Sequence, residues 1–80
     1  MTRRQVIPDA EAIAELTALP PGLRENALAI FELLATDPEP LGAHPYGGIP
    51  DAYEFAIAGL VVLYTVEEKS VSIWRVRADT

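Results

Sequence analysis

The 80-residue chain contains no cysteine, which excludes disulfide bonds and thiolate metal ligands. It has a single histidine, His44, so nitrogen ligands are also scarce, and we expect neither a metal nor another cofactor. A domain of this length buries only about 60% of the surface that its unfolded chain exposes. Dense packing or association with a partner must therefore stabilise it.

Positive charge is scarce as well. Six lysines and arginines face 12 acidic residues, and the formal net charge is -6. Such a chain repels phosphate backbones at long range, which disfavours contact with RNA or the ribosome and favours a basic protein partner. The alternative is an acidic surface that only keeps a small protein soluble. A signal peptide and a run of about 18 apolar residues are both absent, so we expect a cytoplasmic protein without a membrane span.

Half of the residues are hydrophobic, and their spacing predicts two helices in one domain that covers residues 1–80. Asp9 is a favourable N-cap for the first helix, and the proline pair that begins at Pro20 ends it. The link between the helices is short, so they should form an antiparallel hairpin. The predicted apolar stripes are Ile13, Leu16 and Leu19 in the first helix and Leu23, Ala27, Ile30, Phe31 and Leu34 in the second.

Strands are predicted at both ends of the chain. Residues 4–7 favour a short edge strand that stops at Pro8. A long irregular connection over residues 38–50 leads to three further strands. Alternation over residues 52–57, an apolar run over 60–66 with both faces covered, and residues 71–77 predict an antiparallel meander. The predicted fold class is α+β: a short N-terminal strand, a two-helix antiparallel hairpin and a three-stranded antiparallel β-meander.

Several segments of the sequence fall into one familiar order. They are Leu19-Pro20-Pro21, Ala35-Thr36-Asp37-Pro38, Gly47-Gly48, Tyr53-Glu54-Phe55, Gly59-Leu60-Val61-Val62-Leu63-Tyr64 and Ile73-Trp74-Arg75-Val76-Arg77. In these segments the chain resembles the RelE/ParE superfamily of bacterial toxins, over nearly its whole length. The resemblance implies a type II toxin–antitoxin system, in which a co-expressed antitoxin neutralises the toxin. It also implies one of two activities, since RelE-type members cleave messenger RNA on the ribosome and ParE-type members poison DNA gyrase.

Residues for RNA cleavage are few. Such cleavage needs a base, an acid and a cation beside the phosphate, and the resemblance implies basic residues on the meander strands. The family arginine of the central strand is replaced by Val61, and no lysine or arginine lies between Arg24 and Lys69. Arg75 and Arg77 match basic positions of the family's last strand and are the candidate catalytic residues. The alternative is that they stay solvated or pair with the carboxylates of Glu54, Glu67 or Glu68.

Five apolar or aromatic side chains are candidates for partner binding. Leu28 and Leu33 lie off the stripe of the second helix, and are predicted to contact the first helix or a partner. Tyr46 and Tyr53 flank the glycine turn, and Trp74 is predicted to point away from the arginines, which share a parity with Val71 and Ile73. Core packing is the alternative for Tyr53 and for Trp74. His44 titrates nearest neutrality, but a lone loop histidine is typical of polar surface.

Three functions remain after these observations. The first is a toxin-like protein that acts by protein binding and is neutralised by an antitoxin. The second is a RelE-type, ribosome-dependent mRNA endoribonuclease with a minimal site at Arg75 and Arg77. The third is a catalytically inactive interaction module or homodimer. The missing basic residues favour the first and third over the second, and whether the chain is an enzyme stays open.

Overall fold

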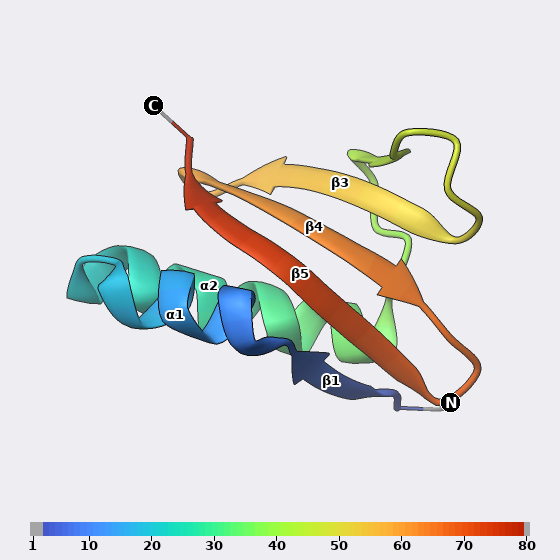
Figure 1. Cartoon of the computed structure of the whole chain (residues 1–80), viewed down its shortest axis with the longest axis horizontal. Helices are drawn as coiled ribbons and strands as arrows, with labels where there is room; N and C mark the ends of the chain where they lie inside the picture. The colour runs from blue at the N-terminus through green and yellow to red at the C-terminus, as the bar shows by residue number, and fades with distance from the viewer. Residues whose placement is uncertain (1–2, 80) are drawn as a thin grey trace.

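The computed structural model describes residues 3–79. In this part of the chain, two helices lie along one side of a five-stranded sheet with the order β1-β5-β4-β3-β2 (Figure 1). The α+β class, the N-terminal edge strand, the helical hairpin and the meander are confirmed. The elements are β1 (Gln5–Pro8), α1 (Ala10–Ala18), α2 (Pro21–Thr36), β2 (Ala43–Pro45), β3 (Ala52–Ile57), β4 (Leu60–Val66) and β5 (Ser70–Ala78).

The helix boundaries follow the local sequence. Asp9 caps α1, because its carboxylate accepts a hydrogen bond from the Ala12 amide at 2.9 Å, and Pro21 opens α2. The predicted stripe of α2 is confirmed, with Leu23 partly buried. The prediction that Ile13 belongs to the buried stripe of α1 was wrong. Its side chain is half exposed, and Ala12 is fully buried instead. Because the alanine side chain is small, α1 can lie close to β5. The buried stripe of α1 is shifted by one residue from the predicted stripe.

The sheet is mixed rather than purely antiparallel. Strands β3, β4 and β5 form the predicted meander, but β1 runs parallel to β5, with Gln5 paired to Ser70. No short loop joins β1 to β5, so nothing forces the antiparallel direction there. The connection over residues 38–50 was predicted to be irregular, yet it contains β2, which pairs with β3. This strand is only three residues long and contains a proline, and so has almost no periodic signal.

The core lies between the helices and one face of the sheet. Strand β4 buries Leu60, Val62 and Tyr64 there, whereas the alternate residues Val61 and Leu63 are only half-buried. The expectation that both faces of this strand are covered was therefore wrong, because the helices cover one face only. The face away from the helices is called the open sheet face below. No helix in the described part of the chain is long and apolar enough to cross a membrane.

A β-bulge in β5 decides where the arginines point. Leu63 pairs with Arg75 and Tyr64 with Ile73, so Trp74 is an extra residue without a partner on β4. The bulge reverses the alternation of the strand. Ile73 and Val76 both face the core. Arg75 and Arg77 both lie on the open sheet face. The predicted shared parity of Val71 and Ile73 with the arginines was therefore wrong.

Candidate functional site

The second half of β5 forms an edge that a helix covers instead of a strand. Strand β1 pairs with β5 only as far as Ile73, and the chain then turns into α1. There the Glu15 side chain of α1 accepts a hydrogen bond from the Val76 amide at 2.9 Å. One carboxylate thus takes the place of a neighbouring strand at this position of the edge.

Both candidate catalytic arginines contact the same carboxylate. Arg75 holds Glu15 with a fork, since its Nε lies 3.1 Å from both carboxylate oxygens and its Nη2 lies 2.9 Å from Oε2. The Nε of Arg77 lies 3.5 Å from Glu15 Oε2. Glu11 adds a longer contact of 3.6 Å to Arg75. The structure therefore brings the two arginines together, as the sequence suggested.

The partner of the arginines differs from the sequence-based alternative. That alternative was solvated arginines or pairing with Glu54, Glu67 or Glu68, but the carboxylate comes from α1, 60 residues away from Arg75 along the chain. The side chain of Glu15 is three-quarters buried, and Ala12, three residues before it in α1, is fully buried.

The electrostatics of this pair keep it ionised. The hydrogen bond from Arg75 lowers the pKa of Glu15, burial opposes that effect, and the Val76 amide and the charges of Arg75 and Arg77 lower the pKa further. In turn, the hydrogen bond to Glu15 raises the pKa of Arg75. A bidentate pair with a backbone donor is among the stronger polar contacts of a protein.

The remaining arginines are also engaged. Arg24 donates to carbonyls at the end of α1, including Leu19 O at 2.9 Å. Arg4 donates to the Glu67 carbonyl at 2.9 Å, and Arg3 pairs with Glu32. All arginines lie within residues 3–79, and each of them contacts an oxygen atom of the chain itself.

The open sheet face beside the arginines is apolar and aromatic. Val61 pairs with Arg77 and Leu63 with Arg75 across β4 and β5. Trp74, which was expected on the other face, donates its indole N–H to Thr65 Oγ1 at 3.3 Å on this side of the sheet. The Tyr46 ring meets it edge to face, with ring centroids 6.0 Å apart.

Tyr53 and His44 lie away from this cluster. Tyr53 faces the helices, where its ring stacks on Tyr64 at 5.7 Å and its hydroxyl donates to Glu39 at 2.7 Å. This is the core packing that was the alternative for Tyr53. His44 lies on β2, separated from β5 by two strands and thus by about 14 Å. The arginines therefore have no imidazole beside them, and the described residues contain no cluster of three or more potential metal ligands.

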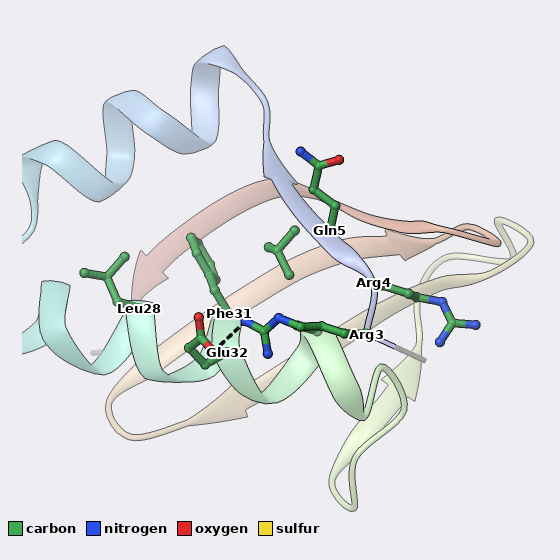
Figure 2. Close-up of a pocket in the computed structure, with 8 residues that line it drawn as sticks. Arg3, Arg4, Gln5, Leu28, Phe31 and Glu32 are labelled. Carbon is green, nitrogen blue, oxygen red and sulfur yellow. Dashed lines mark hydrogen bonds and ion pairs between the residues drawn. The ribbon is translucent and has the colours of Figure 1, made fainter. Parts of the chain in front are cut away.

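A groove of about 530 Å³ lies between β1 and α2 and is called the β1–α2 groove (Figure 2). Figure 2 shows Leu28 and Phe31 projecting from α2, and Arg3 reaching across to Glu32, while Arg4 extends away from them. Of the predicted partner-binding residues, only Leu28 lies here. The sequence did not reveal the groove, because its apolar floor consists of residues that are also typical of a core. Its lining residues are Arg3, Arg4, Gln5, Val6, Leu28, Phe31, Glu32 and Ala35.

Comparison with known proteins identifies the fold. No protein-family model matches the chain, and no curated protein does. Among solved structures, the RelBE2 toxin–antitoxin complex of Mycobacterium tuberculosis is similar with a TM-score of 0.84 and 21% identity, over 98% of this chain and 93% of that one. The RelE–RelB complex of the archaeon Pyrococcus horikoshii has a TM-score of 0.80 and 19% identity, over 98% and 97% of the two chains. The isolated RelE toxin of E. coli has a TM-score of 0.80 and 21% identity, over 96% and 85%.

These similarities extend over nearly the whole of each chain. The chain therefore has a RelE/ParE-like fold, as the sequence resemblance implied. Identities near 20% establish the shared architecture, and the roles of individual residues must be argued from their own surroundings.

Proposed function

We propose that this chain, which has the RelE/ParE-like fold, is a toxin-like protein of a type II toxin–antitoxin system. It acts in the cytoplasm as a single domain, binds a protein target, and is neutralised by a partner antitoxin. Two of the similar toxin chains were solved as complexes with an antitoxin, which supports the partner. We favour a protein target over an RNA target because every arginine already contacts an oxygen atom of the chain itself.

The β1–α2 groove is the proposed docking site of the antitoxin. Its floor is apolar and its rim carries the Arg3–Glu32 ion pair, a combination typical of protein interfaces. Leu28 is 50% exposed at the groove, so half of this apolar side chain remains accessible to a partner. A partner segment that buries Leu28 would supply the reinforcement that a domain without disulfides lacks.

The open sheet face is the proposed contact with the target. Trp74 and Tyr46 offer paired aromatic rings beside Val61 and Leu63, and aromatic anchors on an apolar surface are typical of binding hot spots. The same two strands hold the cations in RNA-cutting members of the family, according to the sequence resemblance. In this chain the central strand contributes only apolar side chains and Thr65 next to the arginines.

Induction of the chain in a bacterial host tests this function. We expect weak growth arrest with intact messenger RNA, measured by growth curves and by primer extension on abundant transcripts. Strong arrest with message cleavage that disappears in the Arg75→Ala, Arg77→Ala double variant would instead establish the ribonuclease. A chain that has no effect on growth, forms a tight homodimer and ignores the product of the neighbouring reading frame would establish an interaction module.

The RelE-type ribonuclease is the second candidate. Arg75 and Arg77 lie one strand period apart and converge on a single anionic group, which is the arrangement that a phosphate needs. However, that anionic group is the chain's own carboxylate, and His44 is far from it. The fork of Arg75 is thus occupied by Glu15, whereas Arg77 is more than half exposed and makes only one longer contact to the same carboxylate.

A further inference from the structure

The two helices leave part of the sheet uncovered on their own side. Both helices lie against β1 and β5, and α2 also reaches β4, but neither helix backbone comes close to β3. Strand β3 nevertheless directs Tyr53, Phe55 and Ile57 to this side, since Ile57 pairs with Leu60 of the core. Phe55 is buried, whereas Tyr53 is only partly buried and Ile57 is nearly half exposed.

Leu33 lies on the flank of α2 that points toward β3. Asn26 is on the same flank, because seven residues make about two helical turns. Its side-chain amide donates to the Ala58 carbonyl, in the turn directly after β3, at 3.1 Å. Leu28 lies on the opposite flank, in the β1–α2 groove. The two exposed leucines of α2 thus belong to two separate surfaces.

The segment that follows α2 crosses the same side of the sheet. Glu39 accepts the hydrogen bond from the Tyr53 hydroxyl, and a Cβ at Gly42 would lie 3.5 Å from the Phe55 ring. Leu41, between these two residues, is fully exposed. The exposed apolar side chains at this junction are called the α2–β3 seam, and they are Leu33, Leu41 and Ile57.

Three carboxylates surround the tyrosines beside the seam. The pKa of Tyr53 is raised, chiefly by its hydrogen bond to Glu39, and then by burial and by the charges of Glu39 and Asp51. The pKa of Tyr64 is raised chiefly by burial, and the charges of Glu39 and Asp37 add to the effect. All three carboxylate residues are exposed.

The chain supplies no cation to this region. No lysine or arginine lies between Arg24 and Lys69, and within residues 3–79 none of the ion pairs involves these three carboxylates. Helix α2 also ends here, with Asp37 as its C-cap and without a basic residue in its last turn. The carboxyl end of a helix carries partial negative charge and is stabilised by a nearby cation. The seam is therefore complementary to a positive charge that another molecule supplies.

We infer that the α2–β3 seam is a docking surface for a basic amphipathic helix of a partner protein. The apolar face of that helix packs on the seam, and its lysines or arginines lie against Asp37 and Glu39. An extended segment fits less well, because the backbone of β3 is already paired with β2 and β4 over residues 53–55. A helix satisfies its own backbone groups and needs only side-chain contacts. The acidic surroundings repel nucleic acid.

This surface is distinct from the β1–α2 groove and from the open sheet face. The inference therefore goes beyond the proposed function and does not rest on it. The experiments in bacteria decide the proposed function separately.

The test is an NMR titration of the full chain with a synthetic helix of about 14 residues, with leucines on one face and lysines on the other. We expect saturable binding that shifts the backbone amides of Leu33, Glu39 and Ile57. A peptide with glutamates in place of the lysines should not bind. A scrambled leucine–lysine peptide without an apolar face should bind at least about tenfold more weakly.

Leu33→Ser tests the apolar part of the seam. It should weaken binding of the leucine–lysine helix at least about fivefold, because an apolar anchor is lost. Leu28→Ser is the matched control, since it makes the same change on the opposite flank of the same helix, and it should leave the affinity unchanged. Equal effects of the two variants, or amide shifts centred on the β1–α2 groove, would overturn the inference.

The charges are tested with the Asp37→Asn, Glu39→Gln double variant, in which the glutamine keeps an oxygen for the Tyr53 hydroxyl. Binding should weaken at least about fivefold and become less sensitive to salt. Glu25→Gln with Glu68→Gln removes the same net charge at exposed positions away from the seam and should have little effect. Since this comparison changes only exposed groups, it decides the matter even if Leu33→Ser does not fold. Equal weakening by the two double variants would contradict a specific site.

Sedimentation of the chain alone examines a second copy as the occupant. We expect a monomer, because two acidic seams repel each other. A dimer that Leu33→Ser dissociates and Leu28→Ser does not would assign the seam to a second copy and refute the basic partner.

Discussion

Tyr64 is the largest fully buried side chain among the described residues, and its hydroxyl must be satisfied inside the core. It donates to the Pro38 carbonyl at 2.7 Å, which ties the end of α2 to the central strand. Burial raises the pKa of Tyr64, so the hydroxyl stays protonated and continues to donate. A tyrosine at this position therefore serves the fold and is not available for chemistry.

Tyr64→Phe should destabilise the chain by about 1–2 kcal/mol, because the Pro38 carbonyl loses its donor while the ring still fills its space. Urea denaturation at neutral pH measures the effect. Tyr53→Phe is the matched control, since it removes a hydroxyl bonded to the exposed Glu39, and it should cost clearly less. Equal losses for the two variants would contradict the role assigned to the buried hydroxyl.

Glu15 makes the stability of the chain depend on pH. Its pKa is lowered in the folded state, chiefly by the hydrogen bond from Arg75, so the unfolded chain binds its proton more readily. The contribution of Glu15 to stability is fully present above its unfolded pKa and disappears as the pH falls through its folded pKa. Its effect is thus felt at neutral pH and lost in acid.

Glu15→Gln should accordingly be less stable than the unmodified chain at neutral pH and should approach it at acidic pH. Urea midpoints measured from neutral to strongly acidic pH give the comparison. Glu11→Gln serves as the control, because it removes a more exposed carboxylate with a single longer contact to Arg75. A constant difference between Glu15→Gln and the unmodified chain at every pH would refute the assignment.

At the scale of helices and strands, the sequence predicts those features that depend on neighbouring residues, such as helix starts and apolar stripes. Asp9 and Pro21 place the helix starts, and the stripe of α2 and the apolar run of β4 place the core. Contacts between distant segments are harder to predict. The bulge at Trp74 interrupts a strand that contains no glycine or proline to mark it, and it moves Arg75 to the other face of the sheet.

The sequence carries one trace of the bulge, since Ile73 and Val76 are both apolar although a regular strand would place residues three apart on opposite faces. In the structure both are buried. The pairing of Glu15 with Arg75 had no such signal, because it depends on where β1 ends and on how α1 lies against the edge of β5. The candidate residues could thus be named from the sequence, but their electrostatic state could not.

The turn between β3 and β4 holds an alanine in a disfavoured backbone conformation, which a substitution can relieve. Ala58 and Gly59 both have positive φ, 55° and 80°, as the central residues of a type I′ hairpin do. Alanine is disfavoured in this region, whereas asparagine followed by glycine is the preferred pair. Ala58→Asn should therefore stabilise the chain by about 1 kcal/mol.

Thermal unfolding checks this prediction, with Gly59→Ala as the opposite control. A Cβ at Gly59 would meet Leu23 Cδ2 at 3.2 Å in addition to the backbone penalty, so this variant should be destabilised. The hydrogen bond from the Asn26 amide to the Ala58 carbonyl is available in both variants. A lower melting temperature for Ala58→Asn would rule out the strain.

At the scale of the whole molecule, stability and partner binding should be coupled. The chain has a small core without covalent reinforcement, and half-exposed Leu28 lies at the β1–α2 groove. A ligand that binds only the folded state stabilises it by mass action, by about 2.7 kcal/mol at a hundredfold excess over Kd. We expect this increase in the unfolding free energy with the antitoxin, represented by the product of the neighbouring reading frame.

Leu28→Glu distinguishes an effect on partner binding from an effect on the stability of the free chain. The side chain is 50% exposed, so its replacement should change the stability of the free chain by less than about 0.5 kcal/mol. A charge on the apolar floor of the groove should nevertheless weaken the complex at least about tenfold and reduce the stabilisation by at least about 1.4 kcal/mol. Leu41→Glu, at a fully exposed leucine outside the groove, is the matched control and should leave both quantities unchanged. If the two variants behave alike with the partner, the antitoxin docks elsewhere, and the apolar rings of the open sheet face become the surface to test.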